Sequence, residues 1–309
     1  MRVLAIHNPD SGSGSGDLFD YLKELVELGC DEVVLRNIHA HEDDQVLLDD
    51  AHDYDLIVLS GGDGTVATLN YELKHSGIPV QVFPSGTANL VASNLSNDEE
   101  PVAMAKAAMD GHTESFDMGE LSYQDKNGET HYIGFSVIAG AGFDATIMHD
   151  SEDLKARMGQ LAYFAAVLAN PNPEIATFKL DLDGEHVEIE GIAVLIINFS
   201  NITFDVSIVN DASPQDGLFH VAVIKSGSTV QLLPTVISAF LDKSGNFPYR
   251  PQLEIFTAKE VKVDANPPLH LQFDGDVIEG AKTPFTARVL EGASKFIVDE
   301  NSPYYRSAD

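Results

Sequence analysis

A near-continuous apolar run that passes directly into a glycine-rich turn constrains this chain most. The run is YDLIVLS, residues 54–60, and GGDGTV, residues 61–66, follows it without a gap. Strands in which almost every residue is apolar are buried on both faces, as in parallel sheets covered by helices. The sequence therefore predicts a central parallel strand that ends near residue 61 and leads into a helix.

The first 115 residues alternate between strand and helix patterns. Apolar runs predict strands at 2–9, 31–38, 54–62 and 78–86, and periodic apolar positions predict helices at 16–29, 42–52, 65–77, 87–95 and 99–111. The order βαβαβαβα predicts a doubly wound, Rossmann-like α/β domain.

From residue 116 the pattern changes to short strands joined by turns. Strands are predicted at 116–124, 131–142, 177–199 with a bend at Asp183 and Gly184, 217–224, 252–258, 269–275, 284–290 and 294–300, and helices at 152–169 and 229–241. We expect a mainly-β sandwich or open barrel over 116–298, residues 299–309 returning to the first domain, and a nucleotide cleft between the two domains.

Charge and cysteine content exclude several classes of protein. The chain of 309 residues has 18 basic and 49 acidic residues, a formal net charge of −31, and one cysteine, Cys30. Nucleic acid is therefore not an expected partner, and neither an internal disulfide nor a cysteine-rich metal site can form. With no signal peptide and no apolar run of about 18 residues, we expect a cytoplasmic protein. The acidity is compatible with a high-salt environment, in which the repulsion between surface charges is screened. It is equally compatible with an ordinary soluble protein whose acidic surface repels itself.

The turn after the predicted third strand has the composition of a phosphate site. Gly61, Gly62, Gly64 and Thr65 fall where a strand ends and a helix begins, and free amides at a helix start attract phosphate. Asp63 would repel phosphate unless a cation lay between them, which indicates Mg²⁺. The structural alternative is a simple glycine turn.

Two further strand ends carry small polar residues. PSGTANL follows the next strand, and its candidates for nucleotide binding are Ser85, Gly86, Thr87 and Asn89. Taken alone, Thr87 is more typical of a helix N-cap, and pairing with the glycine turn favours the nucleotide site. HNPDSGSG follows the first strand, where Asn8, Ser11 and Gly12 form either a third wall of the site or a flexible turn.

Five motifs together resemble a known family. NPDSGSG, GGDGTV, PSGTANLVA, SPQDGLFHV and FDGDVIEG occur in the order and spacing of the diacylglycerol kinase catalytic family, bacterial lipid kinases that also resemble sphingosine kinases. A GGDG loop alone is less specific, since NAD kinases and phosphofructokinases have similar loops. The resemblance covers nearly the whole chain.

The resemblance implies ATP and Mg²⁺ as cofactors and a lipid at a membrane surface as substrate, with peripheral attachment; a homodimer is compatible with it. The family's nucleotide loops match residues 61–65 together with Gly86, Thr87 and Asn89. Its magnesium loop matches Ser213, Asp216 and Leu218, its aspartate at the start of the second domain matches Asp117, and its catalytic base matches Asp276, with Asp63 in the nucleotide loop also assigned to catalysis.

Two departures from the family pattern keep other functions open. Ala67 and Thr68 replace the usual Asn-Glu pair, and Asp276 replaces the usual glutamate base. Taken singly, Asp216 and Asp276 are also typical of turns. The alternatives are a kinase of a soluble substrate such as NAD, and a nucleotide-binding regulator with weak catalysis. The lipid itself is not identified by the sequence.

Two other groups have structural interpretations. No metalloprotease spacing occurs among His39, His41 and His52. A solvent-exposed face is therefore favoured for them over a metal site. The apolar residues within 161–168 favour core packing, with part of an acyl-chain slot as the alternative.

Overall fold

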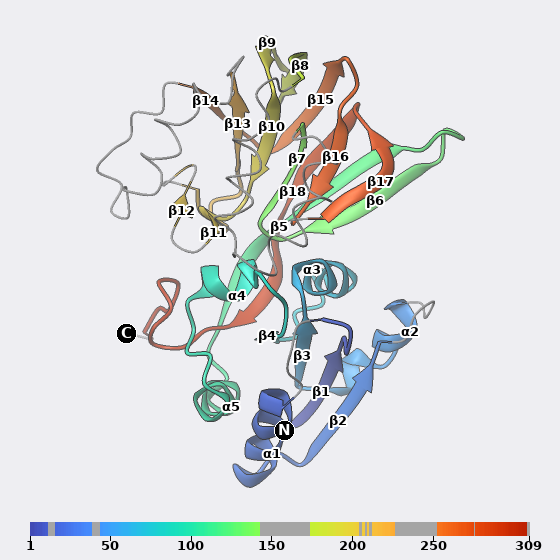
Figure 1. Ribbon diagram of the computed structural model, residues 1–309. Coiled ribbons are helices and arrows are strands. Elements are labelled where there is room, and N and C mark those ends of the chain that lie inside the picture. Colours follow the sequence, from blue (N-terminus) through green and yellow to red (C-terminus); the bar gives the residue numbers. More distant parts are fainter. Residues whose placement is uncertain are drawn as a thin grey trace. The chain divides into compact units, whose positions relative to one another are not determined.

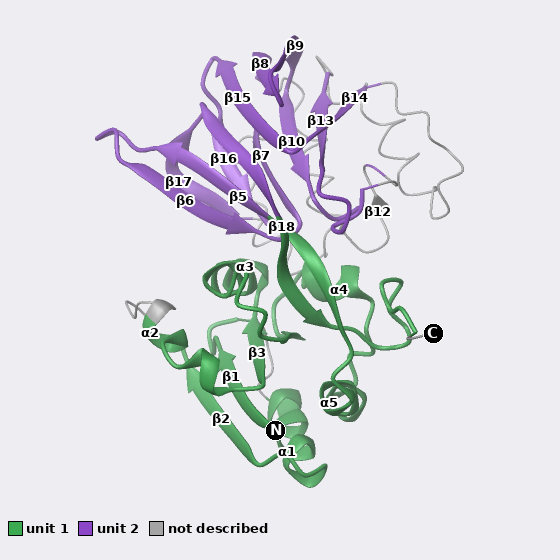
Figure 2. Cartoon of the chain, turned by 180° about the vertical axis from the view of Figure 1, so that it is seen from behind, with its two compact units in different colours: residues 1–118, 291–309 green, residues 119–290 purple. Residues whose placement is uncertain are grey.

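The chain forms two compact units. The computed structural model describes residues 1–11, 16–38, 44–142, 174–203, 206–207, 209, 212–225, 252–274 and 276–307. Unit 1 comprises Met1–Met118 and Glu291–Asp309, and unit 2 comprises Gly119–Leu290 (Figure 2). The helices expected at 152–169 and 229–241, the suggested acyl slot, Gly12, His39 and His41 lie outside the described residues.

Unit 1 is an α/β domain with a parallel sheet in the order β2-β1-β3-β4-β18 (Figure 1). Its elements are β1 (Arg2–His7), α1 (Gly16–Glu27), β2 (Glu32–Asn37), α2 (Asp44–Leu48), the 3₁₀ turn η1 (Ala51–Asp53), β3 (Leu56–Gly61), α3 (Asp63–Glu72), β4 (Val80–Pro84), α4 (Leu90–Leu95), α5 (Pro101–Asp110), the first half of β5 (Thr113–Gln124) and the end of β18 (Phe285–Ile297).

Both faces of the central strands are buried, as the apolar run predicts. The whole of β3 is buried, and along β1 Val3 and Ala5 point to one face while Leu4 and Ile6 point to the other. Apolar positions at helical spacing in α1 and α5 pack together over the first of these faces: Leu18, Tyr21, Leu22, Leu25, Met104, Ala105 and Ala108. The doubly wound expectation is confirmed.

Unit 2 is built from antiparallel strands in two sheets (Figure 1). One sheet has the order β14-β13-β10-β7-β16-β17, and the other has β9-β8-β15-β18 with β5 and β6 joined to it through β18. The strands are β6 (Thr130–Phe135), β7 (Ile138–Gly142), β8 (Ala176–Leu182), β9 (Glu185–Gly191), β10 (Ala193–Ile197), β13 (Phe219–Ile224), β14 (Leu253–Ala258), β15 (Glu260–Asn266), β16 (His270–Phe273) and β17 (Asp276–Lys282), beside the short pair β11 (Asn201–Thr203) and β12 (Val206–Ser207).

The core of unit 2 lies between the inward faces of these sheets. Phe135, Phe178, Phe219 and Phe285 are buried together with aliphatic residues from both sheets. Asp183 (φ 52°) and Gly184 (φ 94°) form the bend between β8 and β9, since two left-handed residues suit a tight hairpin. The mainly-β sandwich is confirmed.

The strand pattern differs from expectation in several places. The segment expected as one strand at 131–142 is two strands, β6 and β7, which belong to different sheets, and 177–199 holds three strands, β8 to β10. β15 was not predicted, although its exposure alternates strictly, and β17 begins at Asp276 where a loop was expected. The two strands expected at 284–290 and 294–300 are one strand, β18, with Gly292 in the left-handed region (φ 57°).

The unit boundaries follow from β5 and β18, which both run from one unit into the other. Unit 1 therefore ends at Met118 and resumes at Glu291, where the sequence suggested 115 and about 299. Near the crossing, Asp117 Oδ1 accepts a hydrogen bond of 2.8 Å from the Gly292 amide. In the described part of the chain, no helix combines the length and apolarity needed to cross a bilayer.

Candidate functional site

The turn between β3 and α3 presents an open helix start. Gly62 is the N-cap residue with extended backbone (φ −79°, ψ 174°), and no side chain caps the helix. The first amides of a helix have no intrahelical acceptor, so those of Gly64 and Thr65 suit an anionic group. Gly61 is required by packing, because a Cβ there would lie 2.7 Å from Thr65 Cβ.

The second predicted turn touches the first. A Cβ on Gly86 would lie 2.6 Å from Gly62 Cα, so the two turns meet backbone to backbone. Asn89 fixes the second turn, since its Oδ1 accepts from the Gly86 amide (2.7 Å) and its Nδ2 donates to the Gly86 carbonyl (3.0 Å). Asn89, in the left-handed region, is also the cap residue of α4, so Thr87, which is exposed, is not the N-cap.

The first predicted loop is tied to the glycine turn. Asn8 Nδ2 donates to Thr65 Oγ1 (2.9 Å), and the Asn8 carbonyl accepts from both the amide (3.2 Å) and the hydroxyl (2.7 Å) of Ser11. The structure thus brings together candidates from three strand ends in unit 1.

Asp63 has a structural contact that the sequence did not reveal. Its side chain is buried, and Oδ1 accepts from the Val91 amide of α4 (3.3 Å). The carboxylate therefore accepts from an amide in the first turn of α4 that has no acceptor within its own helix. This bond joins the two turns in addition to their backbone contact. A role for Asp63 beside a cation stays a prediction.

The predicted metal residues are divided between the two units. In unit 2, Asp216 is exposed and Oδ1 accepts from the Leu218 amide (2.9 Å), and Ser213 and Leu218 are partly buried. Asp117 belongs to unit 1, is buried, and bonds to Gly292 as described above. A side-chain carboxylate and carbonyls in a tight turn are donors that Mg²⁺ prefers, so the 213–218 turn fits the predicted cation.

Asp274, two residues before the predicted base Asp276, was missed by sequence reasoning. Asp274 is 4% exposed with φ 42°, and its carboxylate accepts from three consecutive amides at 2.6–2.8 Å, those of Ser136, Val137 and Ile138. Asp276 is exposed at the start of β17. The repeated aspartate of FDGD was the only signal, and it does not say which carboxylate is buried.

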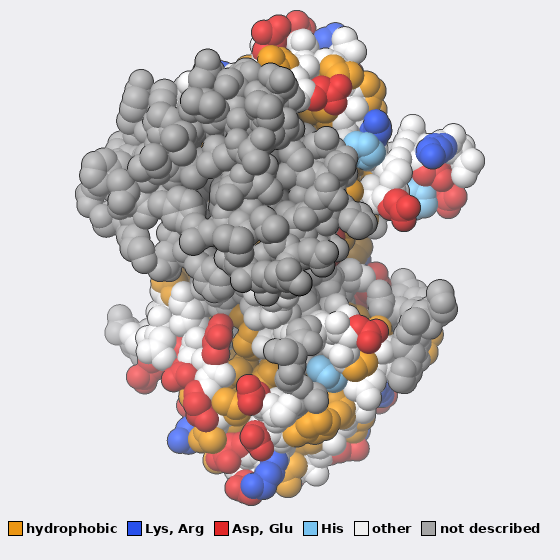
Figure 3. Space-filling model, viewed as in Figure 1, with side chains coloured by type: hydrophobic (Ala, Val, Ile, Leu, Met, Phe, Trp, Pro, Cys, Tyr) orange, Lys and Arg blue, Asp and Glu red, His pale blue; other side chains and the backbone are white. Residues whose placement is uncertain are grey.

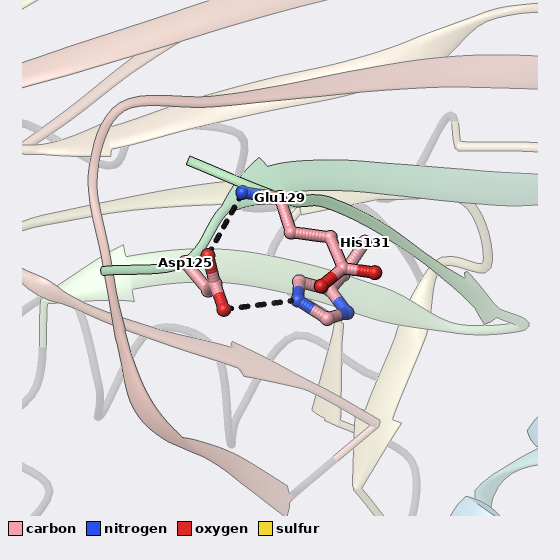
Figure 4. A group of neighbouring side chains, drawn as sticks. All are labelled: Asp125, Glu129 and His131. Atoms are coloured by element: carbon pink, nitrogen blue, oxygen red, sulfur yellow. Dashed lines mark hydrogen bonds and ion pairs between the residues drawn. The ribbon is translucent and has the colours of Figure 1, made fainter. Parts of the chain in front are cut away.

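Two carboxylates and a histidine lie together at the β5–β6 hairpin, where Asp125, Glu129 and His131 place one ligand atom each within 4.8 Å of one another (Figure 4). Asp125 Oδ1 accepts from the amides of Asn127 and Glu129, and the Glu129 amide contributes most to keeping the Asp125 pKa below its usual value. Asp125 is therefore the acceptor that organises this turn.

The surface of unit 1 is rich in carboxylates. On the face that Figure 3 shows, acidic side chains are spread over unit 1 and basic ones are few. A polyanionic substrate that approaches this face gains little attraction at long range, so its binding depends on short-range donors such as the turn amides.

Comparison with known proteins matches both halves of the chain. Residues 2–121 match the diacylglycerol kinase catalytic domain, and residues 137–298 match the YegS C-terminal NAD kinase beta sandwich-like domain. A diacylglycerol kinase of Mycobacterium tuberculosis is 28% identical over 287 residues, 89% of this chain and 88% of that one. One from Bacillus subtilis is 25% identical over 284 residues, 89% of each chain.

Solved structures share the fold. A diacylglycerol kinase of Bacillus anthracis aligns with a TM-score of 0.71 at 22% identity and covers 97% of both chains. A yeast NADH kinase complexed with NADH aligns with a TM-score of 0.56 at 11% identity, over 98% of this chain and 85% of that one. The expected fold class, an α/β domain followed by a mainly-β domain, is confirmed.

Proposed function

The chain belongs to the diacylglycerol kinase family of lipid kinases, and on that premise we propose that it transfers the γ-phosphate of ATP to the hydroxyl group of a diacylglycerol-like lipid, with Mg²⁺ as cofactor. The transfer forms a bond between the lipid oxygen and the γ-phosphorus and breaks the bond to the β-phosphate oxygen. The products are a phosphorylated lipid and ADP.

One observation supports the nucleotide part of the proposal most strongly. Two turns at the ends of adjacent parallel strands are in backbone contact at Gly62 and Gly86, beside the open start of α3. Glycine lets phosphate oxygens approach main-chain amides closely, and the helix start favours negative charge. We assign the triphosphate to the amides of residues 62–65 and 87, since the Gly86 amide already donates to Asn89 Oδ1.

The remaining residues of unit 1 orient these turns. Asn8 holds Thr65 through its side-chain amide, and Asp63 bonds the Val91 amide. Each of these bonds joins two different segments of unit 1, so the main-chain amides of the turns need little rearrangement when a nucleotide binds. Such preorganisation favours phosphoryl transfer.

Mg²⁺ would be held by the turn that contains Asp216, through its carboxylate and neighbouring carbonyls. The cation would neutralise the negative charge that develops on the phosphate oxygens during transfer. Asp216 is exposed and its Oδ1 accepts from the Leu218 amide, so the carboxylate is held at a defined, exposed place in unit 2.

Asp276 is proposed as the base that takes the proton of the lipid hydroxyl. Asp274 positions it, since the three amide bonds of Asp274 fix the backbone immediately before β17. An aspartate is one methylene shorter than the family's glutamate, and a displacement of about 1 Å can lower a rate by about 10²-fold. We therefore expect the acceptor to bind close to the start of β17.

The proposal is tested by incubating the protein with γ-labelled ATP, Mg²⁺ and a total lipid extract, with NAD in a parallel reaction. Label in a lipid product that Asp276→Asn no longer forms supports the proposal. Label in NAD with none in lipid would replace it by the soluble-substrate alternative, and the product mass identifies the acceptor.

A nucleotide-binding regulator with weak catalysis is the second candidate. At the positions of the family's Asn-Glu pair, Ala67 is buried and the Thr68 hydroxyl donates back to the Gly64 carbonyl (2.9 Å), so neither side chain offers the contact made there by a longer polar residue. Tight ATP binding with no phosphate transfer to any lipid would support this candidate. If Asp276→Glu then restores the transfer, the shorter side chain of the base is the cause of the weak catalysis.

A further inference from the structure

Three buried polar side chains form a hydrogen-bonded row under the two turns. His7 Nδ1 lies 2.9 Å from Ser60 Oγ, and Ser60 Oγ lies 2.7 Å from Ser85 Oγ. Their residues are 5%, 0% and 9% exposed. They stand at the carboxyl ends of β1 and β3 and directly after β4, three neighbouring strands of the parallel sheet.

Each member of the row precedes a residue of the candidate nucleotide site. Asn8 follows His7 and reaches Thr65, while Gly62 lies two residues after Ser60 and meets Gly86, the residue after Ser85. The strand ends are thus joined twice, once by buried side chains and once by the loops above them.

We propose that His7, Ser60 and Ser85 act as a clamp: as positioning residues they set the separation of the glycine turn from the Ser85–Asn89 turn, and through it the affinity for a nucleoside triphosphate. The part of this inference that concerns affinity rests on the proposed function. The part that concerns the turns does not.

The chemistry of the row suits such a task. A serine hydroxyl donates one hydrogen bond and accepts others, so Ser60 can serve both neighbours at once. Burial lowers the pKa of His7, which keeps the imidazole neutral near pH 7 and leaves Nδ1 able to pair with a hydroxyl in either direction. If one member is removed, a buried polar group loses its partner, which favours a shift of the strand ends.

Ser60 is the decisive position because it is fully buried. A side chain with no exposed surface cannot touch a nucleotide, so any change in nucleotide affinity on its replacement must pass through the turns. At position 7, asparagine carries its amide atoms at the same number of bonds from Cα as Nδ1, whereas leucine has no polar atom there. The pair His7→Asn and His7→Leu therefore separates the hydrogen bond from the volume.

A second buried hydrogen bond in unit 1 provides the matched control. Tyr21 Oη donates to Gln81 Oε1 (2.6 Å), and Gln81 Nε2 donates to the Met104 carbonyl (3.0 Å). Tyr21, a residue of α1, is fully buried, and neither it nor its partners belong to the turns. Tyr21→Phe removes a buried hydrogen bond of the same kind without breaking the row.

The experiment measures amide hydrogen exchange over residues 61–66 and 86–91, and the dissociation constant of a non-hydrolysable ATP analogue with Mg²⁺, in the full chain. For Ser60→Ala and His7→Leu we expect faster exchange in both segments and a dissociation constant raised by about 5- to 30-fold. His7→Asn should stay near the wild-type values, and Tyr21→Phe should change neither segment.

Equal exchange in all variants, or faster exchange with Tyr21→Phe as much as with Ser60→Ala, would overturn the clamp. Ser60→Ala removes both hydrogen bonds of the row and His7→Leu removes only the one to Ser60, so either variant alone decides the outcome if the other does not fold. Failure of the wild-type protein to bind the analogue would overturn the proposed function, while the exchange data still decide the clamp.

Discussion

The glycine turns of unit 1 and the aspartate turns of unit 2 offer opposite groups to a ligand: hydrogen-bond donors in unit 1 and negatively charged acceptors in unit 2. In unit 1 the candidate donors are main-chain amides such as those of Gly62 and Gly64, and the two turns meet at Gly62 and Gly86 because glycine has no side chain. In unit 2 the candidates are carboxylates, and of the pair in FDGD one is buried on three amides while the other is exposed.

The two aspartates of FDGD show that burial can give chemically identical groups different roles. A buried carboxylate that satisfies three amides stabilises the backbone, because each charge-assisted bond is stronger than a neutral one. Asp276, two residues later, is exposed, so a substrate can reach its carboxylate. Activity and stability should therefore respond separately to changes at Asp274 and Asp276.

Asp276→Asn should give the largest effect on turnover. An asparagine cannot accept the hydroxyl proton, so we expect kcat to fall by about 10²–10⁴-fold with little change in ATP affinity. Steady-state kinetics with a lipid acceptor measure this, and the melting temperature should stay at the wild-type value. Unchanged turnover would remove Asp276 from the mechanism.

Asp274→Ala should give the largest effect on stability. The amides of residues 136–138 would be left without their acceptor, and we expect a loss of at least about 3 kcal/mol in the free energy of unfolding. Urea denaturation measures this, with Asp276→Ala as the matched control at an exposed position. Equal stability of the two variants would contradict the division of roles.

Gly86→Ala tests the contact between the turns of unit 1. The new Cβ would lie 2.6 Å from Gly62 Cα, a main-chain atom that cannot rotate away, so the turns must separate. We expect the dissociation constant for ATP to rise by about tenfold or more, since one displaced phosphate contact is worth about 1.5–3 kcal/mol. Gly16→Ala is the control, because its Cβ would meet nothing within 4 Å; calorimetry that finds the two variants alike would refute the contact's role.

A small pH effect should come from His7. Burial lowers its pKa in the folded protein below the ordinary value of 6.5, so the unfolded chain binds the proton more readily. Stability should therefore fall as the pH drops below about 6.5, and thermal melting at pH 7.5 and 5.5 should show a shift of a few degrees. His7→Asn lacks the titrating group and should lose that component; the same shift in the variant would assign it to other residues.

Much of unit 1 could be predicted because its signals are local. The apolar run before Gly61 and the helical spacing of α1 each reflect burial within one element. The contact of Gly62 with Gly86 and the row through Ser60 could not be read from the chain, since they depend on how neighbouring strands align.

In unit 2 local signals were weaker. The acidic and glycine residues of DVIEGAK suggested a loop, but pairing with β16 makes a strand of it. Gly292 suggested a break, yet β18 continues through it with a left-handed residue. Asp274 and Asp117 accept from amides that are distant in sequence, and no spacing rule predicts such partners.

The most direct test of the account is a crystal structure of the wild-type protein with a non-hydrolysable ATP analogue and Mg²⁺. The account predicts that the phosphates bind the amides of residues 62–65 at the start of α3 and that of Thr87, within hydrogen-bond distance. A nucleotide bound elsewhere, with these two turns unchanged and in contact only with water, would contradict it.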